Sequence, residues 1–353
     1  MTGKHRVWLT ALLALIASEG QNVQAENGSA SDESVVTFSF AVVAEAPFGA
    51  AVEPAFSDVL RAIDSSNAAF TIDLGDIKGL DEPCSDALFE TRKALFDAAR
   101  KPVVVLPGFN DWIACSQQTD TGFDALEWLG RLRELFDGSE VSLGQEPMTV
   151  ARQSGMRRFR DYSENVRWQY GRILFVGLNV AGVNNDFRLA AGRNGEFEDR
   201  VIANRAWLER AFKIAEMHKL PGVVVAIQGD PEFQKPIRPP DRRLNRRDGY
   251  YEFKQLIREL VQHYHGEVLL LHGGVNASKG DEPLSDAQGK PIRNLVRVES
   301  FGSPNVRRWV HVEVDARKAR VFSVRFEDAT ASAPPAGEPP VPSSAPGSDS
   351  DRP

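Results

Sequence analysis

Polar residues follow two apolar runs of strand length in the first third of the chain. Phe70–Leu74 is followed by Asp76, and Val103–Leu106 is followed by Asn110 and Asp111. Because ligands bind at the carboxyl ends of strands in open α/β sheets, we expect these three side chains to project into one crevice. Carboxylate and amide oxygens that converge in this way can hold a cation or transfer a proton. The sequence therefore predicts a hydrolytic site at these strand ends.

Alternating strands and helices must position this crevice. A β-branched and aromatic strand over 35–43 ends at Glu45, and apolar residues at helical spacing predict helices at about 54–65 and 85–99. This β-α-β-α-β order predicts a parallel sheet with right-handed crossovers. Further along we expect helices at 123–136, 200–219 and 250–265, a hairpin around Gly171, a buried strand from Gly222 that ends near Gln228 and Asp230, and strands at 267–271, 295–299, 309–314 and 320–326.

Two later turns are also polar. Asn184 and Asn185 end the segment that contains the expected hairpin, and His272 opens the turn 272–276 after an expected strand. His272 is the only histidine placed at a strand end near the predicted crevice. The other histidines of the mature chain lie in expected helices or an outer strand, where a structural or surface role is the usual one.

The first 25 residues have the pattern of a secretory signal. Lys4 and Arg6 precede an apolar core that is too short to span a bilayer, and small residues at 23–25 offer a cleavage site. An uncleaved anchor is the alternative, but the apolar run ends too early, at about Ala17, to form a membrane span. We therefore expect a secreted or periplasmic bacterial protein, with residues 26–34 as a short linker.

Composition limits the binding partners and the domain organisation of the mature chain. The full chain has a net charge of −7, and removal of Lys4, Arg6 and Glu19 with the signal leaves −8, which argues against general binding of nucleic acids. The tail, residues 328–353, has seven prolines after Ala331 and no aromatic residue, so we expect it to be disordered. Residues 35–327 are then long enough for one large α/β domain. No later run is long and apolar enough to form a transmembrane segment.

The chain has two cysteines, Cys84 and Cys115, each in polar sequence after one of the two strand-end turns. In an oxidising compartment such a pair usually forms a disulfide, which would link the loops behind the two turns. Two buried free thiols are the alternative. Two sulfur atoms are too few for a cysteine-based metal site of the structural zinc type.

The order of these motifs resembles that of the calcineurin-like metallophosphoesterases, and especially a branch of exported bacterial members with a PGDNEW-type third motif. The resemblance covers most of the mature chain and rests on four segments: Gly75–Asp76, Pro107–Trp112, Glu164–Trp168 and His272–Gly274. It implies a four-layer sandwich of two mixed β-sheets flanked by helices. It also implies phosphate-ester hydrolysis at two divalent cations that bridge the substrate phosphate and a hydroxide.

The metal-binding motifs depart from those of the family at most positions. Glu45 stands where the family has aspartate, and Pro47 where it has histidine. Phe109 replaces an asparagine ligand, Asn110 replaces the catalytic histidine, and Gln228 stands at the histidine of the fourth motif. The last Gly-His-x-His motif aligns with residues 273–276, which contain no histidine. Of the usual ligand positions, only that of aspartate 76 is unchanged.

The resemblance still implies a set of oxygen ligands. Asp76 would bridge or hold a cation, with Glu45, Asn110, Asp111 and Gln228 as further ligands. Imidazoles are too few for a usual two-metal zinc, manganese or iron centre, whereas oxygen ligands suit magnesium or calcium. A site without metal is the alternative, in which aspartates and asparagines serve as turn residues.

The catalytic expectations follow from the same alignment. His272 would assist protonation of the leaving group, beside Asn110 and Asp111. The insertion 232–249 is rich in arginine, and its Arg242, Arg243, Arg246 and Arg247 could bind a phosphate or another anion by bidentate contacts. A solvated loop is the alternative interpretation of that insertion.

Three functional hypotheses remain after the sequence is considered. The first is an exported phosphate-ester hydrolase by ancestry, with weak or lost activity. The second is a non-catalytic binding module of the cell envelope, which holds a phosphorylated or other anionic ligand in the old crevice and the basic loop 235–247. The third is a structural or interaction role that uses the tail as a spacer. Motifs of serine hydrolases, P-loop proteins and zincins are absent.

Overall fold

The computed structural model describes residues 35–117, 124–187, 194–235, 248–274, 278–286 and 288–329. Several sequence-based expectations lie outside these ranges: the signal segment, the linker, the four arginines Arg242, Arg243, Arg246 and Arg247, and the chain from residue 330. They remain predictions.

Two β-sheets form the centre of the protein. The first has the order β12-β11-β1-β2-β3, and the second has the order β4-β5-β6-β7-β8-β10-β9. Both sheets mix parallel and antiparallel pairs: β1, β2 and β3 run parallel, as do β6, β7, β8 and β10. The strands are β1 (Thr37–Val43), β2 (Ala68–Asp73), β3 (Val103–Val105), β4 (Ala151–Arg152), β5 (Val166–Tyr170), β6 (Ile173–Gly177), β7 (Gly222–Ala226), β8 (Glu267–His272), β9 (Ser278–Asp281), β10 (Leu295–Glu299), β11 (Arg308–Asp315) and β12 (Phe322–Asp328).

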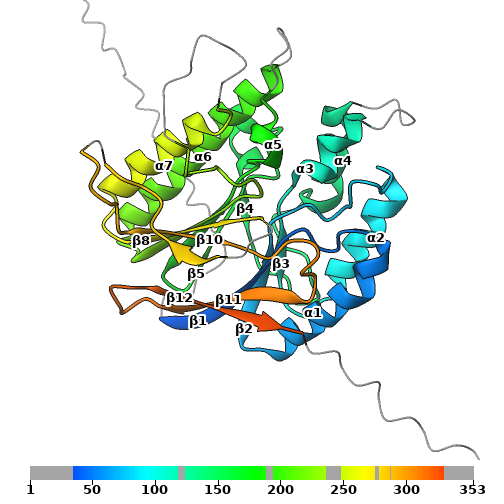
Figure 1. Ribbon diagram of the computed structural model, residues 1–353, viewed down its shortest axis with the longest axis horizontal. Coiled ribbons are helices and arrows are strands. Elements are labelled where there is room, and N and C mark those ends of the chain that lie inside the picture. Colours follow the sequence, from blue (N-terminus) through cyan, green and yellow to red (C-terminus); the bar gives the residue numbers. More distant parts are fainter. Residues whose placement is uncertain are drawn as a thin grey trace, which may run out of the picture.

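Helices cover the outer face of each sheet, which gives four layers (Figure 1). One group packs on the first sheet: α1 (Glu53–Ser65), α2 (Asp86–Asp97), α3 (Phe109–Trp112) and α4 (Ala125–Phe136). The other group packs on the second sheet: α6 (Gly195–Met217) and α7 (Tyr251–His263). The helical turn α5 (Gly182–Asn185) and the 3-10 turns η1 (Ala50–Val52), η2 (Ala114–Gln117), η3 (Gln153–Gly155) and η4 (Arg157–Phe159) complete the elements.

Aromatic residues fill the space between the two sheets. Phe40 and Phe70 from the first sheet meet Phe175 and Trp168 from the second, and the rings of Phe70 and Phe175 lie 5.1 Å apart at 87°. Each such side chain buries roughly 150–250 Å² of surface, so this cluster makes a large contribution to the stability of the sandwich.

The four-layer α/β sandwich expected from the sequence is confirmed. Strand and helix positions differ only at their ends, with one larger exception: α6 begins at Gly195, about five residues before the expected start at Arg200. Glu196 and Glu198 occupy its first turn, where carboxylates interact favourably with the helix dipole, and Phe197 is buried. The turn α3 and the strands β4 and β9 were not expected, because none of them has enough residues to show a periodic pattern.

β1 and β11 together join the beginning and the end of the domain. β11 pairs antiparallel with β1, with Thr37 opposite Asp315, and β12 then pairs with β11. Among the described residues, no helix is long and apolar enough to cross a membrane.

Candidate functional site

The carboxyl ends of parallel strands from both sheets lie at one end of the sandwich, as expected. Asp76 follows β2, the α3 residues follow β3, Gln228 follows β7 and His272 ends β8. Long-range hydrogen bonds, described below, join three of these strand ends directly. The region that these bonds connect therefore lies between the two sheets rather than within either one.

Asp76 is the centre of this region. Its side chain is only 6% exposed; Oδ1 accepts a hydrogen bond from the Asn110 backbone N–H at 2.7 Å, and Oδ2 accepts one from Gln228 Nε2 at 3.0 Å. Its backbone N–H donates to Asp111 Oδ2 at 2.9 Å. Burial, with the neighbouring Asp111 charge as the next cause, raises the pKa of Asp76 well above its usual value.

The amide of Gln228 has a defined orientation. Its Oε1 accepts from the backbone N–H groups of Phe109 at 3.2 Å and Gly182 at 2.5 Å. An N–H group of the amide could not accept from these two donors, so Nε2 must face Asp76. Gln228 thus links α3, the start of α5 and the Asp76 loop through hydrogen bonds.

Asp111 is held mainly by backbone groups. Its Oδ2 accepts from the Gly108 N–H at 2.7 Å and from the Asp76 N–H at 2.9 Å. Burial raises the pKa of Asp111 to about 6, although both backbone hydrogen bonds favour the charged form. Its Oδ1, like Oδ2 of the buried Asp73, accepts no hydrogen bond among the described residues.

The side chain of Glu45 does not join this set of hydrogen bonds, although its backbone N–H donates to the Gly75 carbonyl oxygen at 2.9 Å. Its Oε2 accepts from the Ser303 N–H at 3.1 Å, in the segment between β10 and β11. Burial, together with the nearby Glu299 carboxylate, raises the pKa of Glu45. Both Glu45 (φ 49°) and Asp76 (φ 59°) have left-handed backbone conformations, which non-glycine residues adopt rarely and which are frequent at functional or formerly functional sites.

His272 is fully buried at the end of β8. Its Nδ1 lies 2.7 Å from the carbonyl oxygen of Gly273, and its Nε2 has no hydrogen-bond partner among the described residues. Burial lowers the pKa of His272, so the neutral imidazole is favoured. The charged groups that act on it are Asp230, Arg297 and Glu299 rather than Asp76. The end of β8 is nevertheless joined to the Asp76 region, because the Gly273 N–H donates to the Gln228 carbonyl oxygen at 2.9 Å.

Two buried cations lie near the carboxylates, and sequence reasoning missed both. Lys78 Nζ donates to the carbonyl oxygens of Gly79 at 2.8 Å and Glu82 at 3.0 Å, and its ammonium is close enough to Asp111 to affect the pKa of both groups. Arg92 in α2 forms ion pairs with Glu53 and Glu82, and its Nε donates to the Ile77 carbonyl at 2.8 Å. The position of Lys78, two residues after Asp76, was the available sequence signal.

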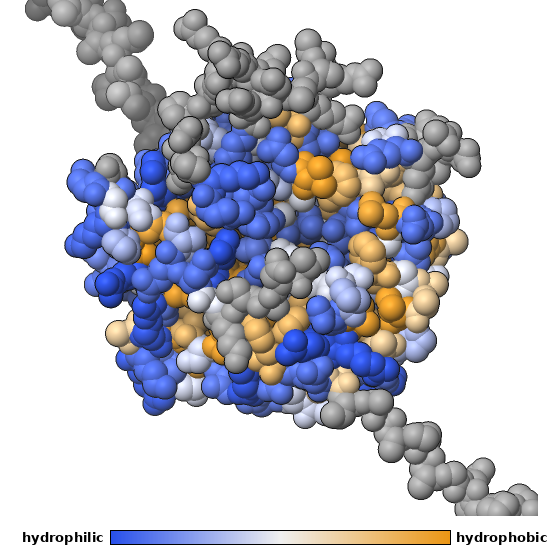
Figure 2. Space-filling view, in the orientation of Figure 1, coloured by the Kyte–Doolittle hydropathy of each residue, from blue (hydrophilic) through white to orange (hydrophobic). Residues whose placement is uncertain are grey.

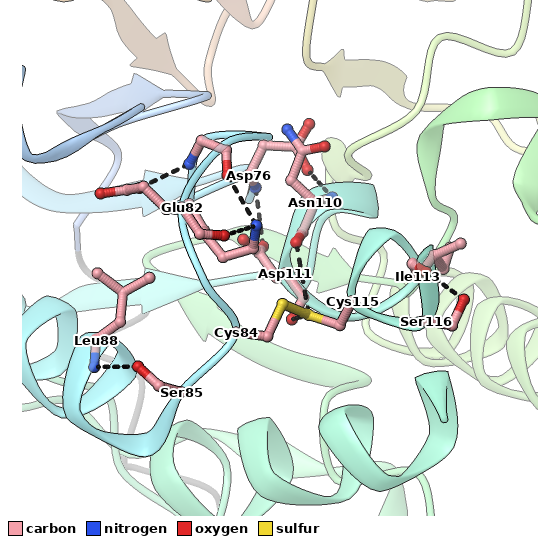
Figure 3. Close-up of a disulfide and its surroundings, with 12 residues drawn as sticks. Asp76, Glu82, Cys84, Ser85, Leu88, Asn110, Asp111, Ile113, Cys115 and Ser116 are labelled. Carbon is pink, nitrogen blue, oxygen red and sulfur yellow. Dashed lines mark hydrogen bonds between the residues drawn. A yellow bond between two sulfur atoms is a disulfide. The ribbon is translucent and has the colours of Figure 1, made fainter. Parts of the chain in front are cut away.

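A disulfide joins Cys84 and Cys115, with their Cα atoms 5.7 Å apart (Figure 3). The predicted disulfide is confirmed, and the alternative of two free thiols is wrong. Cys84 follows the Lys78–Glu82 loop, and Cys115 lies four residues after Asp111. The bond therefore fixes the two loops that carry Asp76 and Asp111.

The residues present do not fit a two-metal centre. Phe109 offers no donor atom, Gln228 directs an N–H toward Asp76, and both oxygens of Asp76 already accept hydrogen bonds. In the described ranges, no group of three or more histidine, cysteine, aspartate and glutamate residues could hold a metal ion. Of the expected oxygen ligands, Glu45 makes a separate hydrogen bond with Ser303, although its carboxylate is near enough to raise the pKa of Asp76.

The turn α5 borders the crevice beside Gln228. Val183, Asn184, Asn185 and Asp186 all have left-handed backbone conformations, and Val183 is 68% exposed. Asn184 Oδ1 accepts from the Gly249 N–H at 2.7 Å, so this expected polar turn has a structural role. Figure 2 shows apolar side chains gathered beside α3 and α5 on this face.

No protein-family model and no curated protein matches this sequence. Three solved structures with similar folds are a dimetal phosphatase from Danio rerio (TM-score 0.47, 11% identity, covering 83% of this chain and 99% of that chain), a purple acid phosphatase from yellow lupin (0.42, 9%, 83% and 54%) and a 5'-nucleotidase precursor from Thermus thermophilus (0.42, 11%, 82% and 54%). Their names agree with the family resemblance of the motifs. At these TM-scores and identities, the likeness carries no argument about the site or the activity of this chain.

Proposed function

We propose that this chain is a non-catalytic, exported protein with the metallophosphoesterase fold, in which the former metal crevice has become a hydrogen-bonded joint between the two sheets. The observation that carries the proposal is the orientation of Gln228. Two backbone donors hold its Oε1, and its Nε2 donates to the carboxylate that the family uses to bridge metals.

A cation at Asp76 would have to displace these contacts. It would meet an N–H donor where the family supplies an imidazole nitrogen, and the freed amide and backbone groups would stay buried without partners. Each buried group left unsatisfied costs about 1–3 kcal/mol. The joint therefore opposes metal binding through several hydrogen bonds at once.

Two buried cationic side chains supply the positive charge that metal ions supply in metal-containing phosphoesterases. Lys78 and Arg92 are both fully buried and both act electrostatically on Asp111. A divalent cation beside them would add like-charge repulsion in a region of low dielectric constant, where such interactions are strong. The local charge balance thus supports a site that works without metal.

Export is the second part of the proposal. It is supported by the signal-like pattern of residues 1–25 and by the disulfide, since disulfides persist mainly in oxidising compartments. We infer that the protein acts in the bacterial cell envelope or outside it, and that it acts by binding.

The test compares metal content and phosphatase activity in three proteins: the wild type, Asp76→Asn, and a triple variant Phe109→Asn, Asn110→His, Gln228→His that restores family residues. Each is purified from an oxidising compartment and supplied with manganese, iron, zinc, magnesium or calcium. Elemental analysis and hydrolysis of p-nitrophenyl phosphate and its diester are measured. Glu90→Gln, at an exposed carboxylate of α2, is the matched control.

The proposal expects the wild type to hold less than a stoichiometric amount of metal and to show no turnover above the Asp76→Asn background. A gain of metal in the triple variant would show that the lost ligands, rather than the fold, prevent binding. One or two equivalents of metal in the wild type, lost in Asp76→Asn but kept in Glu90→Gln, would overturn the proposal.

A second candidate is weak phosphate-ester hydrolysis with one hard cation. The free oxygens of Asp73 and Asp111 favour it, because buried carboxylate oxygens without hydrogen bonds are positions where a cation or a proton can reside. Magnesium or calcium would suit such oxygen ligands. The same experiment separates the two candidates, since this one requires metal-dependent turnover that Asp76→Asn abolishes.

A further inference from the structure

We propose that a trough at the other end of the sheets, at the amino-terminal ends of β1 and β2, binds a neutral oligosaccharide. The trough has a volume of about 660 Å³, which falls within the usual range for small-ligand sites. It is formed by the start of β1, the residues before β2, the end of β5 and the hairpin between β11 and β12. The inference does not depend on the proposed function of the crevice.

Aromatic rings line the trough. The rings of Tyr170 and Phe38 lie 4.8 Å apart at 56°, and Tyr170 also contacts Phe70, at 5.3 Å. Phe38 and Tyr170 are partly exposed, whereas Phe70 is buried behind them. The inter-sheet aromatic cluster holds these two rings in place, so they provide a rigid apolar surface. The C–H face of a pyranose ring packs well on such a surface.

Polar side chains around these rings have hydrogen-bond donors and acceptors that no described residue uses. In the described part of the chain, no hydrogen bond is made by the Tyr170 hydroxyl, the Asn67 side-chain amide or the hydroxyl groups of Thr37 and Ser323. All four residues line the trough. Hydroxyls and an amide can both donate and accept, which matches the hydroxyl groups of a sugar.

The charges at the trough largely cancel. Ion pairs join Lys318 with Asp315 at 3.6 Å, Arg320 with Glu267 at 3.1 Å, and Arg325 with Glu313. A phosphate or carboxylate ligand would therefore have to compete with carboxylates that are already present, and a cation would compete with arginine and lysine. This balance favours a neutral, polyhydroxylated ligand over either kind of ion.

The experiment titrates the mature protein with cellotetraose, maltotetraose and the tetramer of N-acetylglucosamine, each to about 10 mM, a range that detects sites with millimolar Kd. Isothermal calorimetry measures the affinities of the wild type and of Asn67→Ala, Tyr170→Phe and Tyr170→Leu. Gln288→Ala, which removes an exposed amide outside the trough, is the control for Asn67→Ala. Inorganic phosphate is titrated separately as an anionic probe.

We expect at least one sugar to bind the wild type saturably. Loss of a hydrogen bond in Asn67→Ala or Tyr170→Phe should weaken binding about fivefold. Loss of the ring in Tyr170→Leu should weaken it at least about tenfold. Gln288→Ala should bind as the wild type does. If Tyr170→Leu fails to fold, as judged by circular dichroism, Asn67→Ala and Tyr170→Phe carry the test.

Three outcomes would overturn the inference: no binding of any of the three sugars to the wild type, sugar binding that is unchanged in Asn67→Ala and Tyr170→Phe, or binding of inorganic phosphate without binding of sugar. The second outcome would place the sugar elsewhere on the protein. The third would identify the trough as an anion site.

Discussion

The two ends of the sheets differ in what their polar groups do. At the carboxyl end, Asp76, Asp111 and Gln228 are buried and hydrogen-bonded mainly to one another and to backbone groups. At the amino end, Asn67 and Tyr170 line an open trough and make no side-chain hydrogen bonds within the described ranges. At the end with the residue types of an enzyme, most polar groups are therefore hydrogen-bonded within the protein, with Asp73 Oδ2, Asp111 Oδ1 and His272 Nε2 as exceptions among the described residues, whereas the end without them has exposed polar groups available to a ligand.

This comparison indicates that the hydrogen bonds at the carboxyl end of the sheets serve to stabilise the fold. Substitutions there should change the free energy of unfolding by several kcal/mol, whereas Asn67→Ala at the amino end should change it by less than about 0.5 kcal/mol. The predictions below test this contrast, from the largest expected effect to the smallest.

Lys78→Met should have the largest effect. It removes a fully buried ammonium that interacts with Asp111 and leaves the carbonyl oxygens of Gly79 and Glu82 without this donor, which we expect to cost about 3–5 kcal/mol. Urea unfolding followed by tryptophan fluorescence measures the loss. Lys93→Met, on the partly exposed face of α2, is the control and should change the free energy of unfolding little. An equal effect of the two variants would contradict the assignment of Lys78 as a structural cation.

Removal of the disulfide should come next. The double variant Cys84→Ala, Cys115→Ala releases a loop that spans 31 residues, and the chain-entropy model gives a loss of about 3–4 kcal/mol. Thermal unfolding of the variant and the wild type, without reductant, measures it. If the double variant and the reduced wild type are both as stable as the oxidised wild type, packing alone holds the two loops.

Gln228→Leu should cost about 2–3 kcal/mol, because it leaves Asp76 Oδ2 and the N–H groups of Phe109 and Gly182 without their partner. Gln228→Glu should also destabilise near neutral pH, since it places a second carboxylate against Asp76. Unfolding at pH 7 and pH 5 distinguishes the two causes. Both variants keep the gain that Asp111 gives at lower pH, but the glutamate variant should recover more stability than the leucine variant because its own carboxylate is more readily protonated at pH 5.

The pH dependence should give the smallest effect. The pKa of Asp111 is raised to about 6 in the folded protein, so the folded state binds this proton more tightly than the unfolded state does. The stabilising contribution of the Asp111 proton is fully present below the pKa of aspartate in the unfolded chain, which is about 4. It is lost as the pH rises through about 6. Lowering the pH from 7 to 5 should therefore increase the contribution of Asp111 by about 1 kcal/mol. Asp111→Asn should remove that increment. If the free energy of unfolding changes with pH in the variant as it does in the wild type, the prediction is wrong.

The sequence predicted that Asp76, Asn110 and Asp111 meet, because local patterns encode strand ends. The apolar runs before Asp76, Asn110 and Gln228 stop abruptly, and each of these residues lies where the run ends. Two of them are 152 positions apart in the chain and meet in a hydrogen bond, as the topology requires.

The chemistry of the crevice was less accessible to sequence reasoning. The turn of Glu45 toward Ser303 depends on contacts across 258 residues, and the burial of Lys78 depends on how the loop before α2 folds back. The trough has no motif at all, because its residues come from four separate segments. Such features arise from packing between distant segments rather than from any local pattern.

The pairing of β1 with β11 also sets a time for folding in the cell. β1 ends at Val43 and its antiparallel partner does not begin until Arg308, so most of the chain must be synthesised before the first sheet can be completed. At roughly 5–20 residues per second, this interval lasts on the order of 13–50 seconds. During that time, one edge of a strongly apolar strand lacks its partner. During this interval β1 could pair with other chains, so slower synthesis should favour aggregation of the nascent chain.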